Sequence, residues 1–282
     1  MPVFLCLSPV QAESLRIAVI LSESGGAYQE FATALQSQLS EQHNLRVVRV
    51  GDTLPDADLV IAVGMKAANA LAAASQPLLH VLIPRAGFEK LHPESSPLIS
   101  AIYLDQPLER QLALVAAALP AAGNIGVLYA AHTAELDNLR KLSAAKKFAL
   151  QEQPVDRDHP LASALSDLLE ASEVLFVLPD AAVYSSDTIR NILLETYRKQ
   201  VPMIGISPGY VRAGALCAVY STPQQIARQA AEVIKQFAVS GKLPPGQYPN
   251  EFEVSVNTQV ARSLGLVIKD AEQLRAEIRR KP

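Results

Sequence analysis

Short apolar runs alternate with longer amphipathic segments from Leu15 onward, and this alternation constrains the fold more than any other feature of the chain. Apolar runs of this kind are typical of strands that are buried on both faces, and the amphipathic segments between them are typical of crossover helices. Strands that are joined through helices pair in parallel. The sequence therefore predicts an α/β fold with parallel sheets that are flanked by helices.

A first series of elements extends to about residue 119. The expected strands are Leu15–Leu21, Leu45–Val50, Asp58–Val63, Leu78–Ile83 and Ile99–Leu104, and the expected helices are Tyr28–Leu39, Lys66–Ala74 and Gln106–Leu119. The last helix stops at Pro120, because a proline ring cannot continue the helical hydrogen-bond ladder. We expect a boundary between two lobes in the loop that follows.

A second series begins at Ile125. Its expected strands are Ile125–Tyr129, Phe148–Pro154, Val174–Leu178, Met203–Ile206 and Leu216–Tyr220, and its expected helices are Leu161–Leu169, Ser186–Arg198 and Pro223–Val239. Thr133 is a candidate helix cap, and Gly241 is a candidate helix end. Glu251–Val256 alternates apolar and polar residues, which predicts an edge strand. A length of 282 residues suits two lobes, each with its own core.

Composition excludes several classes of function. The net charge is −3 with both signs interspersed, so there is no basic surface for nucleic acid. Cys6 and Cys217 are the two cysteines, and only Cys217 would remain in a processed chain, which excludes an internal disulfide or a cysteine zinc site. The five histidines show no metal-ligand spacing (His43, His80, His92, His132 and His159). We expect neither a metal nor a cofactor.

The N-terminus resembles the end of a secretory signal. Val3–Leu7 is a short apolar run, and Val10-Gln11-Ala12 has small residues at the −3 and −1 positions that signal peptidase prefers. Residues 1–12 are therefore predicted to be the remnant of a longer signal, and the protein is predicted to be periplasmic. The alternative is a cytosolic N-terminus. No other stretch approaches the roughly 20 uncharged apolar residues that span a bilayer.

Candidate binding residues follow the strands, because ligands of open α/β sheets collect beyond the carboxyl ends of the strands. The predicted ligand-binding set is Ser22, Ser24, Gly25, Tyr28, Gln29, Gly64, Met65, Arg85, Asp180, Tyr184, Ser207 and Tyr210. Asp180 is predicted to receive an ammonium or hydroxyl group, the serine hydroxyls and loop amides a carboxylate, and the three tyrosines a flat ring. Each residue also has a purely structural alternative, such as helix capping for Ser22 and Ser24.

Enzyme signatures are absent from the sequence. The turn at Gly25-Gly26 lacks the GxGxxG spacing, and the chain has neither a GxxxxGK[ST] loop nor a GxSxG elbow. We therefore predict no catalytic residues and a protein that is not an enzyme. A less favoured alternative is an active site that the motifs do not reveal.

Five segments together resemble the ABC-transporter substrate-binding family that includes tryptophan- and tyrosine-binding lipoproteins, whose fold is like that of the type I periplasmic binding proteins. The segments are Asp58–Leu71, Gln106–Ala130, Glu173–Ser186, Val201–Val219 and Val256–Leu266. The resemblance implies two Rossmann-like lobes joined by three crossing strands, with a hinged cleft that encloses one ligand. The expected lobes are 14–119 with about 221–242, and 120–220 with about 243–282.

The resemblance implies the solute-binding component of an ABC importer, with a transporter permease as its membrane partner. The expected ligand is a small molecule such as an amino acid or another small polar or aromatic metabolite. Leu79–Arg85 departs from the pattern of the amino-acid-binding members, so the resemblance does not identify the ligand. The alternative is a periplasmic ligand sensor that acts on a membrane receptor kinase.

Overall fold

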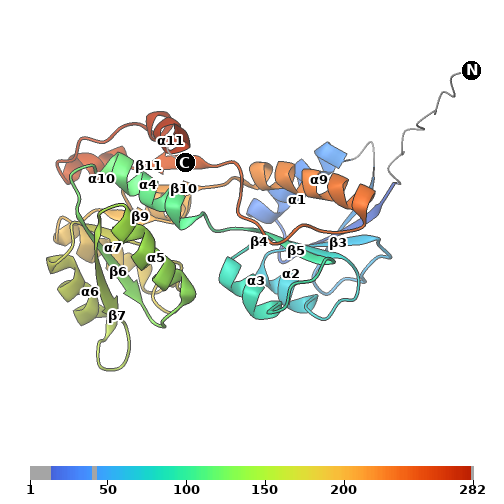
Figure 1. Ribbon diagram of the computed structural model, residues 1–282, viewed down its shortest axis with the longest axis horizontal. Coiled ribbons are helices and arrows are strands. Elements are labelled where there is room, and N and C mark those ends of the chain that lie inside the picture. Colours follow the sequence, from blue (N-terminus) through green and yellow to red (C-terminus); the bar gives the residue numbers. More distant parts are fainter. Residues whose placement is uncertain (1–13, 40–42, 281–282) are drawn as a thin grey trace, which may run out of the picture. The chain divides into compact units, whose positions relative to one another are not determined.

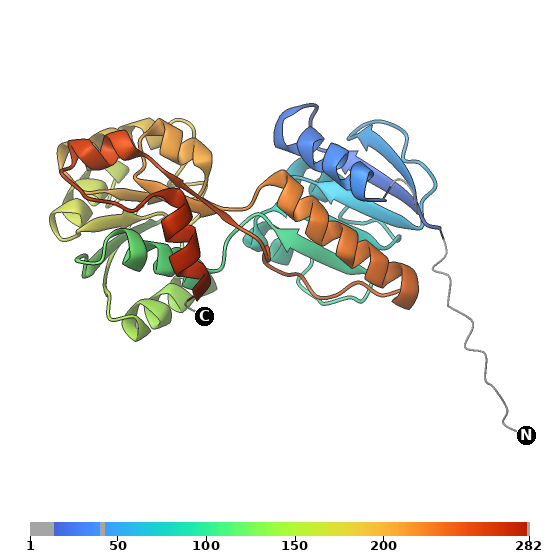
Figure 2. The same cartoon turned by 90° about the horizontal axis from the view of Figure 1, so that it is seen from above.

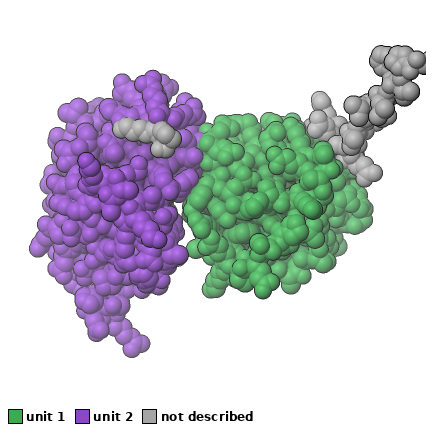
Figure 3. All heavy atoms as spheres, in the orientation of Figure 1, with its two compact units in different colours: residues 1–105, 221–251 green, residues 106–220, 252–282 purple. Residues whose placement is uncertain are grey.

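The computed structural model describes residues 14–39 and 43–280, and the predicted signal remnant with Cys6 lies outside them. The chain forms two compact units (Figure 3). The first unit contains the residues up to Asp105 and the segment Ser221–Glu251, and the second contains Gln106–Tyr220 and the residues from Phe252 onward. The chain therefore passes from one unit to the other three times.

The first unit is built on a five-stranded sheet in which every pairing is parallel, with the order β2-β1-β3-β4-β5. The strands are β1 (Arg16–Leu21), β2 (Asn44–Arg49), β3 (Leu59–Val63), β4 (Leu78–Ile83) and β5 (Ile99–Tyr103). The helices are α1 (Gly26–Leu39), α2 (Met65–Ala70), α3 (Arg85–Leu91) and α9 (Pro223–Ser240). Helices α1 and α9 lie side by side on one face, and α2 and α3 cover the other (Figures 1 and 2).

The second unit is built on a six-stranded sheet with the order β11-β10-β9-β8-β6-β7, in which only β11 is antiparallel to its neighbour. The strands are β6 (Asn124–Tyr129), β7 (Ala149–Pro154), β8 (Val174–Phe176), β9 (Met203–Gly205), β10 (Cys217–Tyr220) and β11 (Glu253–Val256). The helices are α4 (Leu108–Ala118), α5 (Ala134–Ala145), α6 (Leu161–Glu170), α7 (Ile189–Arg198), α8 (Pro208–Ala213), α10 (Thr258–Ser263) and α11 (Ala271–Arg280). The predicted α/β architecture with two parallel sheets is confirmed.

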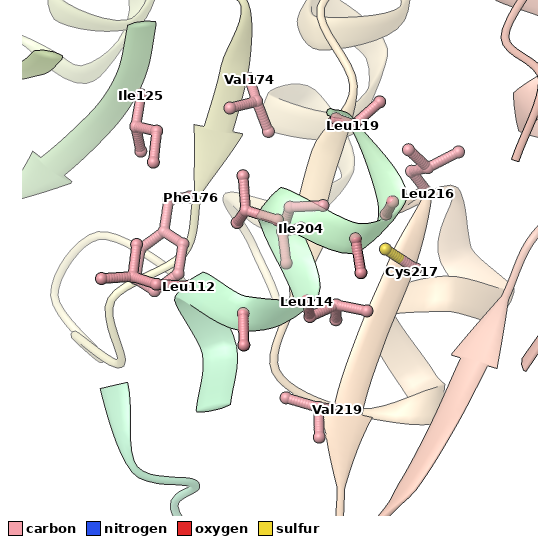
Figure 4. Packing of buried hydrophobic residues seen from close by; sticks show 14 of the residues in the cluster. Leu112, Leu114, Leu119, Ile125, Val174, Phe176, Ile204, Leu216, Cys217 and Val219 are labelled. Carbon is pink, nitrogen blue, oxygen red and sulfur yellow. The ribbon is translucent and has the colours of Figure 1, made fainter. Parts of the chain in front are cut away.

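Each sheet is covered on both faces by apolar contacts. On one face of the second sheet, Leu112 and Leu114 of α4 pack with Phe176 of β8 and with Cys217 and Val219 of β10 (Figure 4). A different cluster on the other face packs α6 and α7 against β6, β8 and β9. Complete burial of a Leu or Phe side chain contributes about 1.5–3 kcal/mol to the stability of a fold. Because these clusters each lie within one unit, each unit has a hydrophobic core of its own.

The unit boundary differs from the predicted one. Helix α4 was expected to close the first lobe, but it belongs to the second unit, because its apolar face packs on β10 and on α11. The last crossing falls after Glu251 rather than near residue 242. Sequence patterning located the helix correctly but could not show that its packing partners lie more than a hundred residues further along the chain.

Local signals for helix ends agree with the structure. Thr133 Oγ1 accepts a hydrogen bond of 3.2 Å from the Leu136 amide and caps α5 as predicted. Gly241 ends α9 with a φ of 67°, the left-handed conformation expected for a glycine at that position. Among the described residues, no helix combines the length and apolar character needed to cross a bilayer.

Candidate functional site

Strand order reverses once in each sheet. In the first sheet the reversal lies between β1 and β3, and in the second it lies between β6 and β8. Such a topological switch point opens a crevice at the carboxyl ends of the strands, where ligands of open α/β sheets bind. Each predicted binding residue lies in a segment that follows the carboxyl end of a strand, in one unit or the other.

Ser22 ties together the two loops at the switch point of the first sheet. Its buried Oγ donates to the Val63 carbonyl at 2.7 Å and accepts from the Ala67 amide at 2.9 Å. Val63 ends β3 and Ala67 lies in the first turn of α2. The hydroxyl therefore has the capping function that was the structural alternative for this residue.

Gly64 and Tyr28 form the surface beside Ser22. Gly64 has φ 85° and ψ 166°, a conformation essentially restricted to glycine. A Cβ atom there would lie 2.7 Å from Ser22 Oγ and 2.8 Å from the hydroxyl of Tyr28. Tyr28 is half-buried in the first turn of α1. These distances show that its ring lies against the backbone of Gly64 at the switch point.

The other residues predicted in this loop are exposed. Ser24, Gly25 and Gln29 lie near the start of α1, and Ser24 Oγ accepts a hydrogen bond of 3.5 Å from Arg49. Gly25 has φ 82° with open space around the position of a Cβ atom. The side chains of Ser24 and Gln29 are therefore accessible to a ligand but do not pack into the hydrophobic core.

Arg85 lies where β4 ends and α3 begins. Its guanidinium donates to the Tyr248 hydroxyl at 3.0 Å and to Glu89 Oε1 at 2.6 Å, and both bonds raise its pKa. The Asp105 carboxylate accepts from the Arg85 amide, while burial raises the pKa of Asp105. Arg85 is therefore a permanent positive charge in a fixed position.

Tyr248 and Met65 complete this edge of the first unit. Sequence reasoning did not single out Tyr248, which reaches Arg85 because Gln247 pairs with Ile102 beside β5. The sequence contains no signal for that pairing. Met65 is partly exposed at the start of α2, and its sulfur lies close to Gly87 of α3.

Asp180 has the corresponding place in the second unit. One carboxylate oxygen accepts from the Ala130 amide at 2.8 Å, and the other accepts from the Ala182 amide at 2.9 Å. Ala130 follows β6 and Asp180 follows β8, so this side chain links the loops on either side of the second switch point. The carboxylate is held in place and keeps further lone pairs for a ligand.

Tyr210 and Ser207 lie after β9, and Tyr184 lies after β8. Ser207 caps α8 by accepting from the Tyr210 amide at 3.4 Å. Tyr210 is half-buried against Gly205, and burial raises its pKa. Tyr184 is only 8% exposed within the core cluster of α6 and α7, and burial also raises its pKa. Of these two tyrosines, Tyr210 has the more accessible ring.

The described part of the chain contains no candidate metal site. No group of three or more His, Cys, Asp or Glu side chains there is arranged to hold a metal ion. The segments that follow the strands in the two units carry aromatic rings, hydroxyls, an arginine and two carboxylates. This set suits noncovalent recognition of a small polar molecule.

Sequence comparison matches residues 30–277 to the profile of one family, described as ABC transporter substrate binding protein. No functionally curated protein matches this chain.

Three solved structures are similar along nearly the whole chain. A conserved domain protein from Vibrio cholerae has 20% identity and a TM-score of 0.64, with 93% of this chain and 98% of that chain covered. An ABC domain from Streptococcus pneumoniae in complex with L-Trp has 16% identity and a TM-score of 0.65, with coverage of 92% and 97%. The ligand-free, open structure of CD0873, a substrate binding protein with adhesive properties from Clostridium difficile, has 15% identity and a TM-score of 0.73, with coverage of 92% and 97%.

Proposed function

Because this chain belongs to the ABC transporter substrate binding protein family, we propose that it is the periplasmic solute-binding component of an ABC importer. Its fold is that of the type I periplasmic binding proteins. In this proposal the protein binds one small molecule, delivers it to a membrane permease and catalyses no reaction on it.

The observation that supports this proposal is the pair of switch points, one in each unit, with polar and aromatic side chains at both. We propose that the ligand binds at these strand ends and has a higher affinity for a closed form of the protein than for an open one. Such differential affinity shifts a hinge equilibrium, and the closed form would be the one that the permease binds.

We further propose an amino acid, or a small aromatic metabolite of similar polarity, as the ligand. Arg85 supplies the positive charge for a carboxylate, and Asp180 supplies an acceptor for an ammonium group. Tyr28 and Tyr210 supply rings for stacking. The L-Trp complex of the structurally similar domain from Streptococcus pneumoniae makes aromatic amino acids the first compounds to test.

A thermal-unfolding panel on protein that has been unfolded and refolded to remove bound ligand tests the proposal. A compound at 1,000 times its dissociation constant stabilises the protein by about 4 kcal/mol, which raises the midpoint by roughly 8–16 °C for a protein of this size. The chain contains no Trp, so the fluorescence of L-Trp itself can be followed.

Two tyrosines provide a matched comparison. We expect Tyr210→Ala to weaken binding of the selected compound at least tenfold and Tyr197→Ala to leave it unchanged, because Tyr197 is exposed on α7 away from the strand ends. Equal loss in both variants would contradict the proposed site. Conversion of the bound compound into a product would contradict a purely transport function.

A further inference from the structure

A pocket lies within the second unit and contains none of the predicted binding residues. Its volume is about 320 Å³, within the range of small-molecule sites. It is formed by α4, the end of α5, the residue before β11, and α11, with the lining residues Pro107, Glu109, Arg110, Ala113, Lys146, Phe252, Ile278 and Arg279. The proposed transport function does not use this pocket.

Two arginines from different helices contact one aromatic ring in this pocket. The Cζ atom of Arg110 lies 4.4 Å from the centroid of Phe252, and that of Arg279 lies 5.6 Å from it. Each contact is a cation–π interaction, because a guanidinium is attracted to the ring of an aromatic side chain. The ring therefore brings two like charges together at the pocket.

The proximity of these charges has an electrostatic cost. Burial and the positive charge of Arg279 both lower the pKa of Arg110. Lys146 adds a third cation to the lining, and Glu109 is its single carboxylate. Within the described residues, neither Arg279 nor Lys146 takes part in an ion pair. An anion between the helices would relieve the repulsion between the two arginines.

The remaining walls are apolar. Pro107, Ala113 and Ile278 line the pocket together with Phe252. A ligand that suits both parts has an oxyanion at one end, to accept hydrogen bonds from the guanidinium groups, and a compact apolar body at the other. We propose that this pocket binds a small organic oxyanion, a carboxylate or a phosphate ester that carries a compact apolar group.

Isothermal titration of the full chain with benzoate, phenyl phosphate and neutral phenol tests this proposal. We expect saturable binding of benzoate or phenyl phosphate at one site per chain, with an affinity that falls as salt is added, and no binding of phenol. The two anions separate a carboxylate site from a phosphate site, and tighter binding of either supports the proposal.

Adjacent residues provide matched controls. Arg279→Gln and Lys146→Gln should each weaken anion binding at least fivefold, whereas Arg280→Gln and Lys147→Gln should not, because these neighbours do not line the pocket. All four side chains are exposed, so the variants should fold. Absence of saturable binding, or equal loss in both members of each pair, would overturn the proposal.

This test is independent of the transport proposal. The pocket variants should leave binding of the transported compound at the strand ends in place, and Tyr210→Ala should leave anion binding in place. Loss of anion binding in Tyr210→Ala would show that the anion binds at the strand ends and would also overturn the proposal.

Discussion

Single polar side chains join the loops at both switch points. Ser22 bonds to Val63 and Ala67 in the first unit, and Asp180 bonds to Ala130 and Ala182 in the second. A buried hydroxyl with both a donor and an acceptor bond stabilises a fold by about 1 kcal/mol per bond. These side chains therefore set the shape of the surface on which a ligand would bind.

Gly64 is the residue where a small change should have the largest effect on that surface. We expect Gly64→Ala to lower the free energy of unfolding by about 2–5 kcal/mol, through backbone strain and overpacking against Ser22 and Tyr28. Gly25→Ala is the control, since it has a similar φ but open space around the Cβ position, and it should cost only about 1–2 kcal/mol. Urea unfolding measures both. Equal losses would show that Tyr28 does not pack on Gly64.

The sequence predicted which residues follow the strands but not which groups they bond. The alternation of apolar runs placed Ser22, Asp180 and Tyr210 in segments that follow strands, where the structure also has them, although Tyr210 lies in α8 rather than in a loop. The pairing of Ser22 with β3 depends on strand order, which periodicity does not encode. The burial of Tyr184 is likewise a result of packing against α6 and α7.

At the scale of elements, α3 is held on β4 by a histidine pair. His80 is fully buried on β4, and its Nε2 atom lies 2.9 Å from Nε2 of His92 at the end of α3. The ring of Phe88 packs edge-on against His80, with their centroids 5.6 Å apart. This contact is a hydrogen bond only while one of the two Nε2 atoms is unprotonated, because an imidazolium nitrogen has no lone pair with which to accept a proton.

This pair should make stability depend on pH. Burial, and to a smaller extent His92, lowers the pKa of His80 from 6.5 to about 3. The unfolded chain therefore binds a proton before the folded one does, and stability falls as pH is lowered from about 6.5 towards 3, by up to about 1.4 kcal/mol per pH unit.

Urea unfolding of the native protein and of His80→Gln between pH 7 and pH 5 measures this effect. Carboxylates outside the pair titrate in both proteins, so the difference between the two profiles isolates the histidine contribution. We expect a shallower pH dependence in the variant. Identical profiles would contradict the assignment of the effect to His80.

The strands were predicted well, whereas several helices were missed. Every strand from β1 to β11 lies within two residues of its expected bounds, because apolar runs and edge alternation have clear periods. Helices α3 and α8 were not expected, and the segment that forms α11 was expected to be a solvated tail. Helices α3 and α8 span only six or seven residues, too few for a helical period to emerge, and each is held by tertiary contacts such as the histidine pair.

At the scale of the whole molecule, neither unit is continuous in sequence. The first unit needs α9, which packs along α1 with Ile226, Ala230 and Ile234 in the same cluster as Phe31 and Leu35. The second unit likewise needs α11, which packs on α4. Each hydrophobic core is therefore complete only when both segments of its unit have come together.

Fragments should reveal this requirement. We expect residues 14–105 alone to be unfolded, and residues 14–105 joined to 221–251 by a flexible Gly/Ser linker to fold cooperatively, because the second fragment restores the partner of α1. Circular dichroism during thermal unfolding measures both. A cooperative transition in the shorter fragment would show that α9 is dispensable for the first core.

The interrupted first unit also has a consequence for synthesis. A ribosome adds roughly 5–20 residues per second, so on the order of ten seconds pass between the synthesis of β5 and that of α9. The apolar face of α1 lacks its packing partner throughout this time. During that interval the nascent chain exposes surface that only its own later part can cover.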